Sequence, residues 1–599
     1  MGPESKARLI TPEASASVRL NSWKEIANYL DRDPRTVQLW EKSEGLPVHR
    51  LNHQTRASVY AYSGEIDAWL RGRSNLAGGE AAEKLESESA PEPKGQRSTG
   101  MYILTVLALA ATLAASFWIG LRQKAAARSS APVLAVLPFQ NQTSTDDFLV
   151  DGLTDELIAD LGRIGKIQVI AHHSSMQFKG RQLTLPQVAT ELHATLALEG
   201  TVAQAGNQTQ VTVELLDAVN NTHLWGATYT RQAGDMVALQ DEIASRIAIE
   251  VTQKVTGSVP QAVFPARAVD PNARKAYLEG RFYWNQRDLP GMQKAISSFG
   301  HAISIDPKYV PAYSGLAESY DLMTDRGILS DAEAFQRAKT AAQTALSLDP
   351  DSAEAYNALA FATYRQDWDF ARAEQYFQKA IELNPNYAVA HQWYGEFLGD
   401  LRRNDESIAE LRKAKDLDPL SPMVGSDLAD GYLHAGRVVE AGDELKRVLD
   451  LYPDFLYAHL YRISLDTGQS DFAAAEAEAQ VILKRTGDAT PLQMVEIRRL
   501  VSQGNMDQAR SEVRRLLSSR QGATFNAYSV AQLDFAIGQD DAGYAALEKA
   551  YRDHSWWLVT MLVDPGFSPV RNQPRFLDLA RRVGLPVASN SVNRDQAER

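Results

Sequence analysis

The chain has 599 residues, with 62 lysines and arginines against 75 aspartates and glutamates, and a net charge of −13. It is several times longer than an ordinary domain, which predicts at least three units, and its acidic balance argues against a protein that coats nucleic acid along its whole length. The absence of cysteine excludes disulfides, thiolate zinc sites and cysteine nucleophiles.

The first predicted unit is a small helical module in residues 18–73, which follows a polar N-terminus (residues 1–17) that we expect to be disordered. Ser22 and Glu25 have the spacing of a capping box at the start of a helix that ends at Leu30. Asp33 caps a second helix, whose first position is proline, where a missing N–H costs nothing. Apolar residues spaced three and four apart predict that the two helices pack together as a helix-turn-helix; these are Ile26, Ala27, Leu30, Val37 and Trp40.

Polar and basic side chains cover the outer face of the second helix and the segment after it. Residues 46–62 are predicted to form a hairpin, and Ile66, Trp69 and Leu70 a short closing helix. Such a helix can read base edges in a major groove, and a cationic hairpin beside it can grip phosphates or the minor groove. The predicted DNA contacts are Arg32, Arg35, Thr36, Gln38, Lys42, His49, Arg50, His53 and Arg56. The alternative is that these side chains only solvate the surface.

Three stretches of this unit resemble the winged helix-turn-helix modules of the MerR and excisionase type: SWKEIANYL (22–30), RTVQLWEKSEGLPVHRL (35–51) and SVYAYSGEIDAWL (58–70). The resemblance implies DNA binding. Many relatives have arginine at the position of Leu39, so one contact of the family is missing here. Basic residues exceed acidic ones by only nine to seven between Val18 and Arg73. One copy therefore neutralises few phosphates, and a homodimer would bind more strongly.

A flexible linker and a membrane span are predicted next. Residues 74–100 are rich in Ala, Glu, Ser, Pro and Gly and cannot bury a core. Residues 101–121, MYILTVLALAATLAASFWIGL, form an uncharged run whose helical length of roughly 30 Å matches the hydrocarbon core of a bilayer. This run predicts a single transmembrane helix; a buried helix of a globular domain is the alternative. The basic residues near its two ends balance, so they do not set its orientation; they are Lys84, Lys94, Arg97, Arg122, Lys124 and Arg128.

Residues 132–257 mix strand and helix patterns and predict a compact α/β domain with a mixed sheet. Strands are expected at 133–139 and 167–171 and as two or three antiparallel strands within 195–229; helices are expected at 151–164, 185–193 and 235–255. The segments LAVLPFQN, FLVDGLTDELIADL, HHSSMQFKG and VTVELLDAVNNTHLWGATY resemble the TolB-like and FlgO-like domains found before tetratricopeptide repeats. This resemblance implies an envelope or sensory interaction domain.

Two features of the α/β domain suggest chemistry, but neither predicts an active site. Asp151, Asp155 and Glu156 are a candidate carboxylate set, and the adjacent pair His172 and His173 is a candidate metal site. Asp151 is expected to cap the helix, the two neighbouring carboxylates to diverge, and the histidines to point to opposite sides of an extended chain. The sequence contains no Walker loop, dinucleotide-binding glycine pattern or Gly-x-Ser-x-Gly elbow. We therefore predict that the protein is not an enzyme and binds no metal or cofactor.

Residues 270–552 predict tetratricopeptide repeats. Prolines recur at 350, 385, 419 and 453, with gaps of 35, 34 and 34 residues, and about 34 residues is the period of this helix-turn-helix unit. Seven or eight units are expected, the last of them degenerate, followed by a C-terminal cap (553–586) and a disordered tail (587–599). Their concave face predicts a protein or peptide partner. Most aromatic residues of the repeats are expected to pack in the repeat core. Trp393 is the exception, because the repeat pattern does not require an aromatic residue at its position.

The order of these units predicts the function. The fold class is multidomain: a winged helix-turn-helix, one transmembrane helix, a mixed-sheet α/β domain and an all-α repeat superhelix. A DNA-binding N-terminus must be cytoplasmic, which places the α/β domain and the repeats in the periplasm and the chain in the inner membrane. The layout is similar to that of the ToxR and CadC group and implies a one-component transcription regulator. The alternative is an envelope scaffold whose N-terminal module does not bind DNA.

Overall fold

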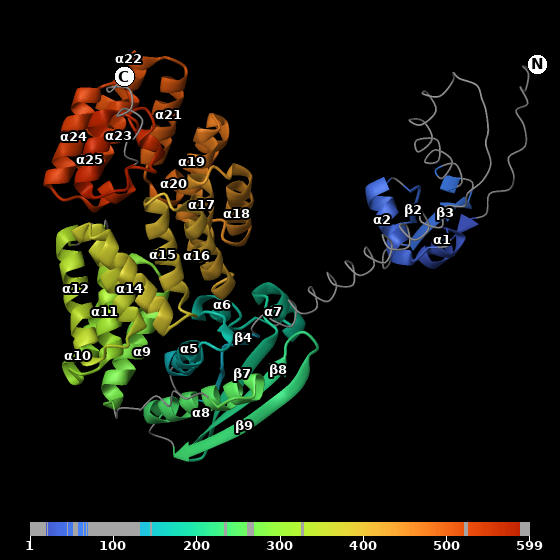
Figure 1. Ribbon diagram of the computed structural model, residues 1–599. Helices are drawn as coiled ribbons and strands as arrows, with labels where there is room; N and C mark the ends of the chain where they lie inside the picture. Colours follow the sequence, from blue (N-terminus) through green and yellow to red (C-terminus); the bar gives the residue numbers. More distant parts are fainter. Residues whose placement is uncertain are drawn as a thin grey trace, which may run out of the picture. The chain divides into compact units, whose positions relative to one another are not determined.

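The computed structural model forms two compact units, residues 1–121 and 122–599, which are described separately (Figure 1). In the first unit it describes residues 19–20, 22–30, 32–44, 46–51, 58–63, 65–66 and 69. In the second unit it describes residues 132–143, 147–181, 183–232, 236–259, 269–324, 329–519 and 525–587.

The described part of the first unit is a helix pair beside a small antiparallel sheet. Helices α1 (Trp23–Leu30) and α2 (Pro34–Glu44) are joined by a tight turn, and the strands β1 (Arg19–Leu20), β2 (His49–Leu51) and β3 (Ser58–Tyr62) have the order β1-β3-β2. Of the predicted helix residues, Ile26, Ala27 and Val37 are in the buried core, and Leu30 and Trp40 pack against it partly buried. The core is completed by Leu46, Ala61 and Ile66. Among the described residues, two helices are followed by the antiparallel strands β2 and β3, which is the order that the sequence predicts.

The second unit begins with a mixed sheet in the order β6-β4-β7-β8-β9, in which β5 also pairs with β7. Its strands are β4 (Val133–Val136), β5 (Gln140–Gln142), β6 (Gln168–Val169), β7 (Leu196–Ala205), β8 (Gln208–Asp217) and β9 (Thr222–Gln232). β4, β5, β6 and β7 pair in parallel, whereas β7, β8 and β9 are antiparallel. The expected strand 133–139 is thus interrupted. The sequence predicts two or three antiparallel strands, and three are present.

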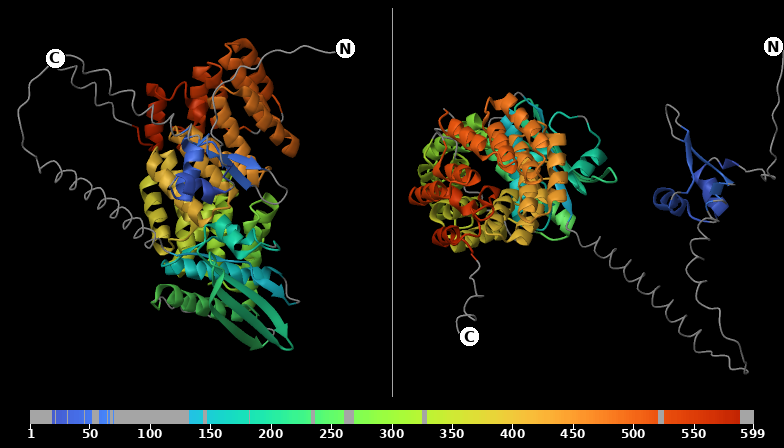
Figure 2. Two further views of the ribbon diagram at one scale, coloured as in Figure 1. Left: turned by 90° about the vertical axis from the view of Figure 1, so that its right-hand side faces the viewer. Right: turned by 90° about the horizontal axis from the view of Figure 1, so that it is seen from above.

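Helices cover both faces of this sheet because its side chains alternate. Leu134 and Val136 of β4 pack against α5 (Asp147–Ile164) and α8 (Met236–Thr256), and Ala135 between them packs toward α7 (Leu185–Leu192). The short helix α6 (His172–Met176) follows β6. The long strands β8 and β9 lie on the side of the sheet away from the helical repeats (Figures 1 and 2).

From residue 271 onward the chain forms eight consecutive helix pairs in the part that the structure describes. They are α9 (Pro271–Asn285) with α10 (Leu289–Ile305), α11 (Val310–Asp321) with α12 (Asp331–Leu348), α13 (Ala353–Ala362) with α14 (Phe370–Leu383), α15 (Ala388–Asp400) with α16 (Asn404–Leu417), α17 (Pro422–His434) with α18 (Val438–Leu451), α19 (Leu456–Gly468) with α20 (Phe472–Thr486), α21 (Thr490–Ser502) with α22 (Met506–Leu517), and α23 (Ala527–Ala536) with α24 (Asp540–Arg552). Each pair packs on the next, as in a tetratricopeptide superhelix.

The chain after the eighth pair packs on that pair and also reaches back to the third. The 3-10 turns η3 (Trp556–Thr560) and η4 (Pro565–Phe567) and helix α25 (Pro574–Val583) share a core with α23 and α24. The same core includes Trp368 and Phe370, which flank the junction between the π-helical turn η1 (Thr363–Asp367) and α14. The segment predicted to cap the last repeat therefore also closes the superhelix onto its third pair.

The α/β domain docks on the loops that connect successive repeats. Asn386, between α14 and α15, donates its side-chain N–H to the carbonyls of Gly162 and Ile167, each at 3.0 Å, and accepts from the Val169 N–H at 3.1 Å. The Asp418 carboxylate, after α16, accepts from the backbone N–H of Ser174 at 3.1 Å. These bonds join the α/β domain and the repeats into one body.

Candidate nucleic-acid interface

Helices α1 and α2 begin at the predicted caps. The Ser22 hydroxyl accepts from the Glu25 backbone N–H at 3.2 Å, and the Asp33 carboxylate accepts from the Arg35 backbone N–H at 2.8 Å. Each bond satisfies an N–H that the first turn of a helix otherwise leaves without a partner. The turn is closed by a 3.0 Å bond from the Arg32 N–H to the Ala27 carbonyl. The caps and this bond fix where α2 starts and which face it presents.

The face of α2 opposite the core carries the predicted DNA contacts. Arg35 is exposed and Gln38 half-buried, whereas Val37 between them is fully buried. Positions 35, 38, 39 and 42 follow the i, i+3, i+4, i+7 spacing of one helical face. Leu39 lies in the middle of this row and is 60% exposed. A helix with this outward row is suited to lie against DNA, with an apolar residue where an additional contact would fit.

The other predicted contacts are distributed around this row. Arg32 is exposed in the turn before α2, and Thr36 is half-buried on it. Lys42 belongs to α2, and Arg50 belongs to β2. His53 and Arg56, predicted near the tip of the wing, lie outside the described residues.

His49 is held by the wing itself. Its Nε2 lies 2.7 Å from a carboxylate oxygen of Glu65, and its ring stacks on Tyr60 with 5.1 Å between ring centroids. His49 is also the cross-strand partner of Tyr60. These contacts connect the hairpin to the closing segment. A direct contact of His49 with DNA stays a prediction.

The carboxylates singled out in the α/β domain have structural partners, and two of the expectations about the carboxylates and histidines are corrected. Asp151 lies inside α5, which begins at Asp147, so it is not a cap; both of its oxygens accept from Lys179 at 2.8 Å. His172 and His173 are on helix α6 and not on an extended chain, and both line one cavity together with Asp155. Because α6 turns the chain, neighbouring histidines that would diverge on a strand face the same space.

The two neighbouring carboxylates on α5, Asp155 and Glu156, each form ion pairs with basic side chains. Asp155 lies 3.3 Å from His172 and 3.3 Å from Arg281, and Glu156 lies 3.2 Å from Arg274. Although burial opposes it, the nearby positive charge of Arg281 and the imidazole of His172 hold the pKa of Asp155 well below its usual range. Among the described residues no group of three or more His, Asp or Glu side chains is arranged to hold a metal ion.

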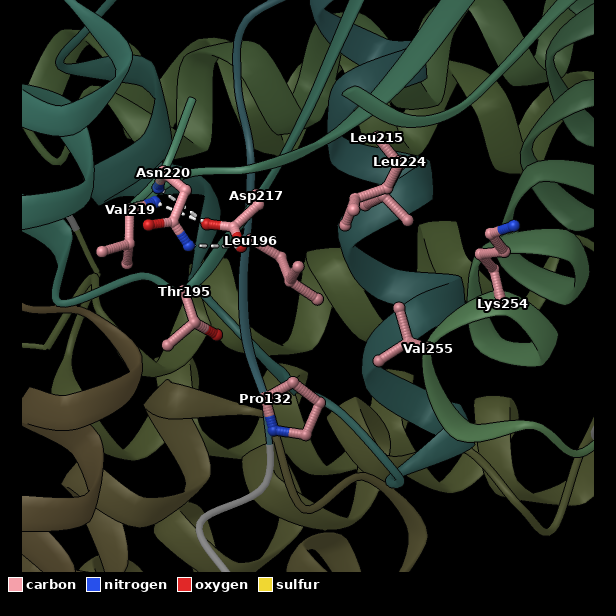
Figure 3. Close-up of a pocket in the computed structure, with 10 residues that line it drawn as sticks. All are labelled: Pro132, Thr195, Leu196, Leu215, Asp217, Val219, Asn220, Leu224, Lys254 and Val255. Atoms are coloured by element: carbon pink, nitrogen blue, oxygen red, sulfur yellow. Dashed lines mark hydrogen bonds between the residues drawn. The ribbon is translucent and has the colours of Figure 1, made fainter. Parts of the chain in front are cut away.

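A hollow of about 540 Å³ lies where the chain enters the α/β domain at Pro132, between the β8–β9 turn and the end of α8 (Figure 3). Asp217, the carboxylate in its wall, accepts from the backbone N–H groups of Val219 and Asn220 at 3.0 and 2.9 Å. These bonds lower the pKa of Asp217. The carboxylate thus holds the turn, and the other wall residues in Figure 3 form no catalytic constellation with it.

The first helices of the second and fifth repeat pairs carry acidic side chains that are closed to solvent. Glu318 and Asp321 of α11 are 0% and 1% exposed, and Asp427 of α17 is 4% exposed. Burial raises the pKa of Glu318 to about 8. Trp393, which the repeat pattern does not require, is also buried, with its ring 4.4 Å from that of Phe361. These side chains therefore belong to the interior of the repeats and not to their solvent-exposed surface.

Within the described ranges, no helix combines the length and the apolar character that crossing a bilayer needs. The span predicted at residues 101–121 and the linker before it lie outside those ranges. The prediction of a membrane span therefore rests on the sequence alone.

Comparison with known proteins identifies the domains of the second unit. Residues 129–246 match the model of the second domain of HilA/YgeH-like transcriptional regulators, and residues 353–387 and 376–409 match tetratricopeptide-repeat models. The chain is 22% identical over 321 residues to the transcriptional regulator HilA of Salmonella paratyphi A, covering 52% of this chain and 56% of that protein. It is 29% identical over 188 residues to "Putative adenylate cyclase 3" of Rhizobium meliloti, covering 31% of this chain and 32% of that protein.

The chain thus spans about a third to just over half of the length of these curated relatives. Among solved structures, PilF of Pseudomonas aeruginosa is 23% identical, with a TM-score of 0.29 over 35% of this chain and 91% of that one. TTC0263, a repeat protein of Thermus thermophilus, is 22% identical, with a TM-score of 0.27 over 32% of this chain and 98% of that one. The chain contains a HilA/YgeH-like transcriptional-regulator domain followed by tetratricopeptide repeats.

Proposed function

We propose that this chain is a membrane-anchored, non-catalytic transcription regulator. The observation that carries the proposal is the order of its parts: a winged helix-turn-helix precedes a domain that matches the second domain of HilA/YgeH-like regulators. The N-terminal unit binds DNA, and the α/β domain with the repeats receives the signal. The proposal is also supported by the similarity to HilA and by the resemblances to MerR-like and TolB-like domains.

In this proposal α2 enters the major groove. Arg35 and Gln38 on its outward face contact bases or phosphates, and the wing formed by β2 and β3 lies against the neighbouring backbone. Few phosphates are neutralised by one copy, so two copies joined as a homodimer give the affinity that a regulator needs.

The proposed topology follows from the apolar run at residues 101–121. This run crosses the inner membrane, the helix-turn-helix lies in the cytoplasm, and the α/β domain and repeats lie in the periplasm. A protein or peptide that binds the outer part would shift the balance between monomer and dimer. A single helix can transmit this change because association does not require it to bend.

The DNA-binding part is tested by chromatin immunoprecipitation of the full-length protein, followed by a reporter driven by the recovered sites. Arg35→Ala with Gln38→Ala should abolish site recovery and reporter control. Arg372→Ala, which removes a 63% exposed arginine side chain from the repeats, should leave both intact. Unchanged regulation in the α2 variant would contradict the proposal and favour the envelope scaffold.

The topology is tested with reporter fusions at residues 80 and 260. Activity of a cytoplasmic reporter at 80 and of a periplasmic reporter at 260 is expected. The reverse pattern would place the helix-turn-helix away from DNA and overturn the regulator.

A further inference from the structure

A cavity of about 190 Å³ lies where the α/β domain meets the first repeats. Helices α5 and α6 form one wall, and α9 with the starts of α11 and α15 forms the other. Two consecutive domains therefore build one site. Several arginines and carboxylates line it, so the pairing of its charges decides what it can bind.

The carboxylates of the cavity already have partners. Asp155 is paired with Arg281 and His172, Glu156 with Arg274, and Glu354 with Arg163 at 3.8 Å. Asp418 accepts from both the backbone N–H and the hydroxyl of Ser174. A cationic ligand would have to displace one of these partners, which would leave another buried charge without compensation.

Three side chains of the same cavity, Arg287, Trp284 and His173, have a nitrogen atom without a hydrogen-bond partner among the described residues. Arg287 has no carboxylate within 4.0 Å among the described residues, and its guanidinium lies over the Trp284 ring at 3.5 Å. Trp284 is 2% exposed, and its Nε1 has no hydrogen-bond partner. His173 Nε2 is buried and also lacks one. The buried Trp284 Nε1 and His173 Nε2 cost free energy unless a ligand or water completes their hydrogen bonds, whereas the Arg287 side chain is exposed.

We propose that this cavity binds a small organic monoanion through its carboxylate, with Arg287, Trp284 Nε1 and His173 Nε2 as the donors. Arg287 supplies the charge-assisted bond, and the indole and imidazole N–H groups direct the two oxygens. Apolar atoms of Ile158 and Val389 line the same space and suit a short hydrocarbon body.

The charge balance favours a carboxylate over a phosphate. Four arginines and four carboxylates line the cavity. Arg287 is the lining arginine that forms no ion pair within 4.0 Å in the described part of the chain, and the Asp418 carboxylate acts on it from farther away, so a ligand with one negative charge suits the site better than one with two. Burial lowers the pKa of His173, so its imidazole is neutral at pH 7 and adds a donor but no charge. The Arg287 side chain is exposed, but partial desolvation of its guanidinium lowers its pKa to about 10. A bound anion would offset the cost of desolvating the charged guanidinium.

The size of the cavity limits the ligand to a few heavy atoms, because pockets for drug-sized ligands have about 300–1,000 Å³. Since both walls contribute, occupancy would strengthen the docking of the α/β domain on the repeats. The inference rests on residues 132–587 and not on DNA binding, so either proposal can fail without the other.

The test is calorimetric titration of the purified full-length protein with butyrate, n-butylammonium and inorganic phosphate. Butyrate should bind, and n-butylammonium and phosphate should bind more weakly or not at all. Arg287→Gln should weaken butyrate binding about tenfold or more, as the loss of one charge-assisted bond requires. The variant keeps a non-glycine residue at a φ of 58°, so backbone strain is unchanged.

Trp284→Phe removes the N–H donor while keeping an aromatic ring, and it should weaken binding less than Arg287→Gln. Arg287→Lys should retain part of the affinity, and the outer-face variant Arg372→Gln should retain all of it. Failure of butyrate to bind would overturn the proposal, as would equal affinity of wild type and Arg287→Gln. Tighter binding of phosphate or butylammonium than of butyrate would overturn the assignment of the ligand class.

Discussion

Arg365 of the third repeat lies over the ring of Trp556, which follows the eighth repeat, with 4.4 Å between its guanidinium carbon and the ring centroid. Nearby, Trp368 stacks on His554 with 3.8 Å between ring centroids. These contacts join segments almost two hundred residues apart and close the superhelix on itself. An open solenoid has contacts only between neighbouring repeats, so this closure adds cooperativity between the third pair and the end of the chain.

Trp556→Ala should therefore destabilise more than the eighth repeat alone. Its side chain is 7% exposed, and truncation of a buried tryptophan costs about 3–5 kcal/mol. We expect a lower urea midpoint and faster amide exchange in both α14 and α24. Val439→Ala, at a side chain that is 77% exposed, should change the midpoint little. Faster exchange confined to α24 would show that the closure does not couple the two regions.

Asn386→Ala should loosen the α/β domain from the repeats. The change removes three hydrogen bonds to the backbone of residues 162, 167 and 169. Each buried group left without a partner costs about 1–3 kcal/mol. The Val169 amide should then exchange at least about tenfold faster, whereas Asn505→Ala, in an exposed turn of the repeats, should leave that amide unchanged. Unaltered exchange at Val169 would contradict this role of Asn386.

Local patterns were sufficient to predict most individual elements. The capping residues Ser22 and Asp33 mark the starts of α1 and α2, and the helix predicted at 185–193 is α7 at Leu185–Leu192. The mixed-sheet domain and the all-α repeats are present as predicted. These predictions succeed because caps, turns and periodicity are properties of neighbouring residues.

Contacts between distant segments could not be predicted in this way. The bond between Ser174 and Asp418 spans 244 residues, and neither residue stands out in its own helix. The cavity donors Trp284 and Arg287 were missed for the same reason, since their importance depends on what the α/β domain places opposite them. One signal was available: Arg274 and Arg281 are seven residues apart on α9, which puts both on the face that meets Asp155 and Glu156.

The buried acid Glu318 should make the repeats less stable as the pH rises. Burial raises the pKa of Glu318 from 4.5 to about 8, so the folded chain holds a proton that the unfolded chain releases between these values. The stability linked to this proton is complete below pH 4.5 and is lost as the pH rises through 8. Burial raises the pKa of Glu396 to about 7 and that of Asp400 to about 6, which acts in the same direction.

We therefore expect the thermal midpoint of the repeats to fall between pH 5 and pH 8 and to fall less in Glu318→Gln. The amide mimics the protonated acid and keeps its shape. Glu382→Gln, at a side chain that is 70% exposed, should leave the pH dependence as in the wild type. A Glu318→Gln protein whose midpoint falls as steeply as that of the wild type would rule out this role for Glu318.

Leu39→Arg should strengthen DNA binding by the N-terminal unit. Leu39 is 60% exposed and occupies the same face of α2 as Arg35 and Gln38, so an arginine there would reach the DNA that these residues are proposed to contact. One added phosphate contact should steepen the dependence of log K on log salt by about 0.9, measured by fluorescence titration of duplex DNA with the full-length protein. Leu39→Gln, which is polar but uncharged, should not change this slope. If the two variants gave equal slopes, α2 would not face the phosphates, and the docking proposed for this helix would be wrong.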